Sequence, residues 1–507
     1  MINKKQGFGI FVFLLILFVG LFLFPLGREL SSFSLSELLF HLCVPLKGAN
    51  NSVIWNVLRQ CCPVPLIATV ISGILLIFPQ KSNISIKFSG RLVKNDIYIR
   101  PINVLRRNFC WISALVLIAG GFYFSNKMNV VEYFSQLSAK TSLYEQKYVD
   151  PAEQEFEYPE EKRNLIFIYM ESMESTYADK PSGGEWEYNL IPNLSKMAAD
   201  NISFGGQNGE GKAGMISPVN SAAWTMGALV GSTAGLPLKL PIDGNSYGDY
   251  SFLLPGAVTM NDLLKDAGYN QVFMIGSDGA FGGRSDYFEQ HGDVFIFDIN
   301  EAKRQGLIEN DYHNGFWGIE DGLLYDYAKN ELLRLAAEGE PFNLTLLTVD
   351  THFFDGYVCP QCETQWDTQY ENVISCADRQ VMDFVDWVTK QDFFPNTSIV
   401  IIGDHLSMDD SFFEQHNIAK DRRGIYNCFI NSAVQPVANA TARKLTIYDI
   451  FPSTLAALGI TWDCNCLGLG TNLFSGEGTL IEQMGIDNFN SELGKTSYFY
   501  DKRFIYP

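Results

Sequence analysis

Four short polar segments follow apolar, strand-like runs and carry side chains that can bind metal or phosphate. They are Glu171-Ser172, Gly276-Ser277-Asp278, Asp350-Thr351-His352 and Gly403-Asp404-His405. Because ligands of open parallel sheets bind at the carboxyl ends of the strands, we expect these side chains to lie at one edge. Asp404 offers a carboxylate, His405 an imidazole and Glu171 a second carboxylate, which are common metal-binding groups. We therefore interpret these three residues as candidate metal ligands, although a turn or cap role is the alternative for each residue alone.

The scarcity of histidine near these segments bears on the identity of the metal. The chain after residue 126 has five histidines: His291, His313, His352, His405 and His416. A two-zinc site would normally use several imidazoles, whereas an oxygen-rich site with one histidine suits Mn²⁺ or Mg²⁺. The sequence therefore favours one divalent metal, with Mn²⁺ as the first choice and Mg²⁺ as the second.

A hydroxyl nucleophile can be sought in the small, glycine-rich stretch at 217–235. Thr225 opens what reads as a buried helix over Trp224–Val230. A hydroxyl at a helix N-terminus lies in positive potential beside free N–H groups, which suits phosphate binding and nucleophilic attack. An ordinary capping threonine is the alternative interpretation.

Short apolar strands alternate with helical stretches in this part of the chain, and this pattern predicts how the segments are positioned. The clearest strands are Asn164–Met170, Gln271–Ile275, Phe342–Val349 and Ser398–Ile402. They are apolar on both faces, as in a parallel sheet covered by helices on both sides. Helical stretches such as Thr259–Ala267 and Gly322–Ala337 lie between them. We predict an α/β fold with a doubly wound, mostly parallel sheet.

Three long apolar runs precede this domain, at Phe8–Leu26, Val64–Phe78 and Phe109–Phe124. The first is long enough to cross a bilayer and lacks a following cleavage site, so an uncleaved anchor is favoured over a signal peptide. The predicted organisation is a membrane anchor with three transmembrane helices at 1–126, a linker at 127–160, a catalytic domain at 161–476 and a C-terminal tail at 477–507.

Basic residues in the loops predict the orientation of the anchor. Seven lysines and arginines lie between the second and third runs, against three between the first and second. By the positive-inside rule, the second loop and the N-terminus face the cytoplasm, and everything after about Phe124 lies outside. The segment Leu35–Leu58 would then form an interfacial helical hairpin at the outer face.

Charge and cysteine content limit the possible partners and crosslinks. The net charge of -20 argues against nucleic acid, because phosphate backbones need clustered lysine and arginine. An oxidising compartment would permit disulfides, and a loop disulfide from Cys359 or Cys362 to Cys376 is the favoured pairing. A zinc knuckle at Cys359 and Cys362 is not favoured, because the sequence has no second pair of ligands at zinc-finger spacing.

The ordered set of motifs resembles a known family. The segments are NLIFIYMESMESTY at 164–177, AAWTMGALVGSTAGLPL at 222–238, GAFGGRSDYFEQHG at 279–292, LTVDTHFFDGY at 347–357 and IIGDHLSM at 401–408. Together they resemble the phosphoglycerol transferase I and lipoteichoic acid synthase family, with the sulfatase-like fold of the alkaline phosphatase superfamily. The resemblance covers roughly residues 160–475.

The resemblance implies roles for particular residues. Glu171, Thr225, Asp404 and His405 would surround one metal, and Thr225 would form the phosphoglycerol-enzyme intermediate. Arg284 and His352 would bind the phosphoglycerol group, and His352 could also act as general acid or base. The tryptophan that lipoteichoic acid synthases place before the arginine is replaced here by Gly282-Gly283, so the glycerol pocket is expected to differ.

The implied activity is transfer of sn-glycerol-1-phosphate from phosphatidylglycerol to a hydroxyl of a glycan, a polymer or a polyol-phosphate acceptor. The expected location is the bacterial cytoplasmic membrane, with the catalytic domain facing the cell envelope. A phosphoethanolamine transferase is the first alternative, although such enzymes usually have more histidines and disulfides. A sulfatase would need a C/S-x-P-x-R signature, and the outer part of the chain has none. A non-catalytic glycan-binding or sensor module on the same fold is the alternative from another class.

Overall fold

The computed structural model describes residues 4–31, 33–43, 51–77, 86–88, 97–99, 101–206, 214–239, 253–312, 314–437 and 439–507. The chain divides into two compact units. The first comprises residues 1–35 and 50–135, and the second comprises residues 36–49 and 136–507.

The first unit is built on three apolar helices, α1 (Lys4–Glu29), α4 (Pro63–Ile77) and α5 (Pro101–Lys127). α1 packs closely on α5, because a Cβ at Gly20 would lie only 2.6 Å from the backbone nitrogen of Leu117. Among the described helices, Gly7–Glu29 and Arg107–Lys127 are long and apolar enough to cross a membrane. Two of the three predicted spans, in α1 and α5, are therefore long enough. The third, α4, has 15 residues, and about 20 are needed to cross the hydrocarbon core.

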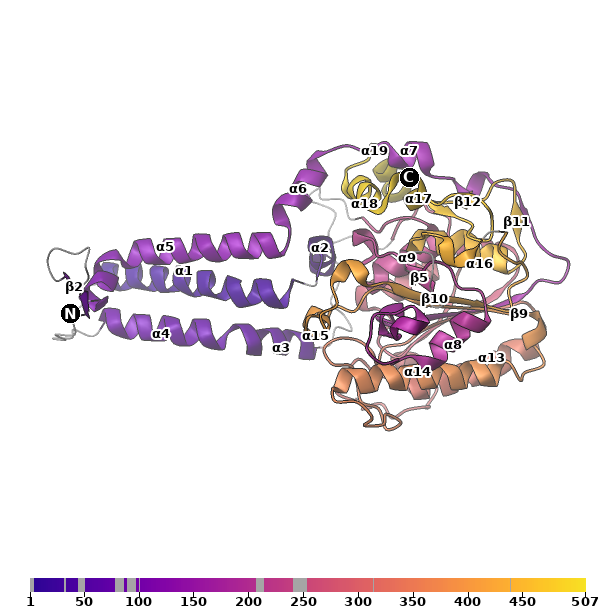
Figure 1. The fold of residues 1–507 in the computed structure, drawn as a ribbon, viewed down its shortest axis with the longest axis horizontal. Coiled ribbons are helices and arrows are strands. Elements are labelled where there is room, and N and C mark those ends of the chain that lie inside the picture. Colours follow the sequence, from indigo (N-terminus) through magenta and orange to yellow (C-terminus); the bar gives the residue numbers. More distant parts are fainter. Residues whose placement is uncertain are drawn as a thin grey trace. The chain divides into compact units, whose positions relative to one another are not determined.

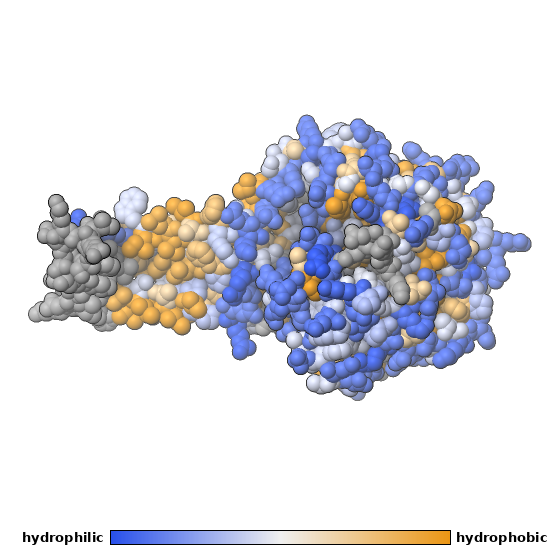
Figure 2. Space-filling view, viewed as in Figure 1, coloured by the Kyte–Doolittle hydropathy of each residue, from blue (hydrophilic) through white to orange (hydrophobic). Residues whose placement is uncertain are grey.

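The outward faces of these helices are apolar, which separates them from the core helices of a soluble domain. Phe8 in α1 is 70% exposed and Trp111 in α5 is 74% exposed. Figure 2 shows hydrophobic residues spread over α1, α4 and α5. Exposed apolar surface on this scale marks a membrane or protein contact, and helices of this length and composition fit a membrane.

Two short helices, α2 (Leu35–Cys43) and α3 (Asn51–Cys61), occupy most of the segment expected as a helical hairpin. The segment joining them lies outside the described residues. The same holds for much of the basic loop that predicts the orientation, in which β1 (Ile86–Phe88), β2 (Ile97–Ile99) and the first residues of α5 are described.

The second unit is centred on a seven-stranded sheet with strand order β5-β10-β9-β4-β8-β6-β7. The four predicted strands are β4 (Asn164–Met170), β6 (Asn270–Ile275), β8 (Phe342–Leu347) and β9 (Thr397–Gly403). These four are neighbours and run parallel, so the predicted α/β fold is confirmed. The remaining strands are β5 (Gly214–Ile216), β7 (Phe295–Phe297) and β10 (Ile425–Ile430), of which β5 and β10 pair antiparallel.

Helices cover both faces of the sheet, as the apolar character of the strands predicts. Side chains on one face of β4, such as Ile166 and Ile168, join a buried core with residues from α8, α13 and α14. Figure 1 shows these helices on one side of the sheet and α9 and α16 on the other. The bounds are α8 (Pro192–Asp200), α9 (Thr225–Ala234), α10 (Met260–Asp266), α11 (Arg284–Gln290), α12 (Ile299–Arg304), α13 (Asp321–Glu338), α14 (Gln369–Val388), α15 (Asp410–Gln415) and α16 (Ile450–Ala457).

The segments expected as linker and tail both contain helices. Residues 127–160 include α6 (Val130–Ser138) and α7 (Leu143–Lys147), and β3 (Phe156–Glu157) pairs with β11 (Thr461–Trp462). Residues 477–507 form α17 (Leu480–Met484), α18 (Ile486–Gly494) and α19 (Tyr498–Tyr500), and bury residues such as Phe489 and Tyr500. The polar composition of both segments reflects their outer faces, while scattered apolar residues pack inward.

Candidate active site

Three buried side chains meet at the carboxyl edge of the sheet. Glu171 follows β4, and Asp404 and His405 follow the neighbouring strand β9. The Nε2 atom of His405 lies 3.5 Å from Oε1 of Glu171 and 3.3 Å from Oδ2 of Asp404. One ligand atom from each residue lies within 4.8 Å of the others. The structure thus brings together the three residues that the sequence nominates as metal ligands.

The hydrogen bonds of His405 leave one ring nitrogen facing this cluster. Its Nδ1 donates to the carbonyl oxygen of Leu406 at 2.8 Å. This bond places the proton of a neutral imidazole on Nδ1, so the lone pair of Nε2 points towards the two carboxylates. A neutral imidazole oriented in this way is the form that binds a metal.

One of the two carboxylates has an oxygen atom available to bind a cation. Oδ1 of Asp404 accepts from the backbone N–H groups of Ser172 and His405, both at 2.8 Å, whereas Oδ2 is buried without a hydrogen-bond partner among the described residues. Burial, and then the nearby charge of Glu171, raises the pKa of Asp404 to about 6. A divalent cation would bind Oδ2 of Asp404 and reduce the repulsion between the carboxylates of Asp404 and Glu171. The three residues therefore fit a metal site.

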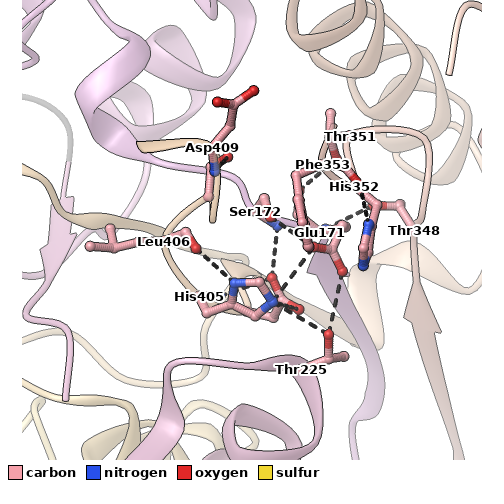
Figure 3. A network of polar contacts seen from close by, with 12 residues as sticks. Glu171, Ser172, Thr225, Thr348, Thr351, His352, Phe353, His405, Leu406 and Asp409 are labelled. Atoms are coloured by element: carbon pink, nitrogen blue, oxygen red, sulfur yellow. Dashed lines mark hydrogen bonds and ion pairs between the residues drawn. The ribbon is translucent and has the colours of Figure 1, made fainter. Parts of the chain in front are cut away.

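Thr225, which is carried by α9, lies next to the three candidate metal ligands. It is the first residue of the buried helix α9, and its hydroxyl lies 3.4 Å from Oε2 of Glu171 and 3.4 Å from Nε2 of His405. Figure 3 shows Thr225, Glu171 and His405 converging on one point. A hydroxyl at the positive end of a helix, beside a metal-binding cluster, has the placement of a nucleophile for a phosphate ester.

Arg284 interacts electrostatically with Glu171 and Asp404. It begins α11 and is buried, and its Nε has no hydrogen-bond partner among the described residues. Burial lowers the pKa of its guanidinium, while Glu171 and Asp404 act in the opposite direction. A buried arginine with an unused donor near this cluster is suited to bind an anionic oxygen.

His352 lies beside Glu171 in Figure 3. Its Nδ1 donates to the carbonyl oxygen of Phe353 at 2.7 Å, and its ring packs on Trp317 with a centroid distance of 4.7 Å. Burial is the main cause that lowers the pKa of His352 to about 4. His352 is therefore neutral at physiological pH and carries no fixed positive charge.

A buried ion pair, which sequence reasoning missed, supports the loops of the cluster. Arg423 Nη2 pairs with Oε1 of Glu174 at 2.5 Å, and both side chains are almost fully buried. The same Glu174 oxygen accepts from the N–H of Ser407 at 2.9 Å, and Arg423 Nη2 donates to the Ser407 carbonyl at 2.6 Å. The pair thereby joins the loop after β4 to the loop after β9. The sequence motif MESMES contains Glu174, but nothing in the sequence identifies its partner 249 residues away.

The expected loop disulfide is absent. The Sγ atom of Cys359 lies 3.6 Å from that of Cys362 and 3.8 Å from that of Cys376, beyond the length of a covalent bond. The three cysteines do lie together, so the prediction names neighbouring residues, but no disulfide joins them.

Comparison with known families agrees with this geometry. Residues 234–460 match the sulfatase family. The match includes His352, Asp404 and His405, whereas Glu171 and Thr225 precede it. The mostly parallel sheet, with its site at the carboxyl edge, is the alkaline-phosphatase-like fold that the resemblance predicts.

Individual relatives are phosphoglycerol transferases. The domain is 28% identical over 336 residues to phosphoglycerol transferase I of Escherichia fergusonii, covering 65% of this chain and 41% of that protein. It is 30% identical over 293 residues to the enzyme of the same name from Xanthomonas campestris pv. campestris, covering 56% and 39%. The chain thus spans about two fifths of the length of these curated relatives.

A solved structure is also similar. The crystal structure of the lipoteichoic acid synthase LtaP from Listeria monocytogenes aligns with a TM-score of 0.47 at 16% identity, covering 67% of this chain and 80% of that chain.

Proposed function

We propose that the protein is a membrane-bound, metal-dependent phosphoglycerol transferase that uses phosphatidylglycerol as donor. The observation that carries the proposal is the position of the Thr225 hydroxyl, 3.4 Å from both Glu171 and His405 at the start of α9. The similarity to phosphoglycerol transferase I supports the choice of head group. The acceptor is a hydroxyl of a glycan, a polymer or a polyol phosphate.

The first half-reaction transfers the head group to the protein. The oxygen of Thr225 bonds to phosphorus, the bond from phosphorus to the diacylglycerol oxygen breaks, and the threonine proton is ultimately passed to that leaving oxygen. Glu171, Asp404 and His405 would hold one Mn²⁺ or Mg²⁺, which when bound lowers the pKa of the hydroxyl and stabilises negative charge on phosphorus. Arg284 binds a phosphoryl oxygen.

The second half-reaction releases the head group. The acceptor hydroxyl attacks the phosphorus of phosphothreonine, the bond to Thr225 breaks, and the threonine recovers a proton. His352, neutral at physiological pH because its pKa lies at about 4, can accept the proton of the incoming hydroxyl. Water in place of the acceptor would give unproductive hydrolysis.

The apolar helices supply access to a lipid donor. α1 and α5 would anchor the chain in the cytoplasmic membrane. α4 is too short alone and would complete a three-span anchor together with its flank Cys61–Pro63, and the catalytic domain would face the envelope. A periplasmic reporter enzyme fused after Pro507 tests this orientation. Activity of the fusion supports the proposal, and an active cytoplasmic reporter at the same position contradicts it.

A phosphoethanolamine transferase would use the same nucleophile with another head group. The full-length chain in detergent micelles should release diacylglycerol from phosphatidylglycerol in the presence of Mn²⁺. With phosphatidylethanolamine as sole lipid, release should fall at least tenfold. Equal or faster release from phosphatidylethanolamine would reverse the assignment. No release from either lipid, with correctly folded protein, would favour a non-catalytic glycan-binding or sensor module.

A further inference from the structure

Three cysteines outside the candidate active site form a compact cluster. Cys359 and Cys362 lie in the loop between β8 and α14, and Cys376 lies in α14. Their ligand atoms all lie within 4.8 Å of one another. Cys359 and Cys362 are neighbours in the sequence, whereas Cys376 joins them because α14 packs against their loop.

The spacing of the sulfur atoms fits a tetrahedral metal site. The Sγ separations from Cys359 are 3.6 Å and 3.8 Å. Two thiolates on a tetrahedral Zn²⁺, each with a bond of about 2.3 Å, lie roughly 3.8 Å apart. A disulfide would instead join two sulfurs at about 2.0 Å and leave the third cysteine with no partner in the cluster. One shared ion would give all three sulfur atoms a common partner.

Hydrogen bonds to Cys359 favour the thiolate that a metal requires. The side-chain amide of Gln380 donates to its Sγ at 3.3 Å, and the backbone of Gln361 also hydrogen-bonds to it. The N–H of Cys362 donates to the carbonyl of Cys359 at 3.0 Å, which closes a tight turn over the Cys-x-x-Cys pair. N–H groups directed at a ligand sulfur are a typical second layer around thiolate metal sites.

The surroundings are negatively charged and would be balanced by a cation. The carboxyl groups of Glu320, Asp321 and Asp350 are close enough to Cys359 to interact with it electrostatically. One carboxylate oxygen of Asp350 is buried with no hydrogen-bond partner among the described residues. An ion with two positive charges between the thiolates would stabilise this region.

We propose that Cys359, Cys362 and Cys376 bind one Zn²⁺ ion and supply three of its four ligands. The ion fastens the loop after β8 to α14. Because His352 lies in the same loop, seven residues before Cys359, the zinc site also restricts the movement of His352. The site is separate from the cluster of Glu171, Asp404 and His405, and the proposal does not depend on the proposed function.

Metal analysis of the full-length chain in detergent tests the site. After growth with added zinc and extensive dialysis, the protein should contain one Zn²⁺ per chain. His405→Ala, which disrupts the other cluster, should retain this zinc. Cys362→Ser should lose at least 80% of it, and the matched control Cys464→Ser should keep it. Zinc content that Cys362→Ser leaves unchanged overturns the proposal.

Two measurements on the unmodified protein guard against a variant that fails to fold. Replacement of zinc by Co²⁺ should give the near-ultraviolet charge-transfer absorption of a thiolate–cobalt bond. Peptide mapping without reduction should find all three cysteines unlinked once the metal is removed by a chelator. A disulfide between any two of them in freshly purified protein, or three free thiols in a zinc-free protein that gives no cobalt–thiolate band, also overturns the proposal.

Discussion

The hydroxyl oxygen of Thr225 lies 3.4 Å from Nε2 of His405, although 180 residues separate them in the chain. The two atoms come together because α9 begins where the carboxyl ends of β4 and β9 deliver Glu171 and His405. A metal held by the nitrogen and the two carboxylates would therefore lie next to the hydroxyl that the proposed mechanism activates. The following predictions test this arrangement and the contacts that support it.

Removal of one metal-binding group should remove both metal and activity. In Asp404→Asn, the amide keeps the shape and can still accept from Ser172, but it loses the negative charge that faces the site. We expect at least a hundredfold fall in diacylglycerol release and loss of bound Mn²⁺ by metal analysis. Asp298→Asn, which changes a carboxylate that caps α12, serves as the control and should retain both. Normal metal content in Asp404→Asn would exclude this carboxylate as a ligand.

The buried pair of Glu174 and Arg423 should contribute strongly to stability. Glu174→Gln leaves Arg423 buried without its main counter-charge, which typically costs about 3–5 kcal/mol. The double variant Glu174→Met/Arg423→Met removes both charges and should be less destabilised than the single variant. Thermal unfolding of the purified chain measures both effects. If Glu174→Gln unfolds at the same temperature as the wild type, the pair is unimportant for stability.

The low pKa of His352 predicts a pH effect on stability. The unfolded histidine takes up a proton near pH 6.5, whereas the folded one does so only near pH 4. Between these values the unfolded state binds more protons, so stability falls as the pH is lowered from about 6.5 towards 4. His352→Gln should reduce this fall by about 1–3 kcal/mol. Melting temperatures at pH 7 and pH 5, measured with chelator present, compare the two proteins, and an identical shift in both would contradict the low pKa.

The strands that carry the site could be read from the sequence because each is a continuous apolar run with a polar end. Glu171 and Asp404 follow such runs directly, and parallel pairing then brings them to one edge. The contacts that hold the site depend on long-range packing instead. The partner of Glu174 is 249 residues away, and Cys376 meets Cys359 only because α14 packs against the loop. The apolar run at 64–78 correctly locates a helix, but the helix over residues 63–77 has 15 residues, fewer than the roughly 20 that cross a bilayer.

Mass spectrometry of Thr225 after incubation with phosphatidylglycerol and Mn²⁺ tests the central claim most directly. The peptide that contains Thr225 should gain one phosphoglycerol group, and Thr225→Ala should lose both the adduct and turnover while remaining folded, at a cost of about 1–2 kcal/mol. Thr225→Ser should keep part of the activity. Thr233→Ala, which removes another buried hydroxyl from α9, should keep the adduct. A folded Thr225→Ala protein that releases diacylglycerol at the normal rate would contradict the account.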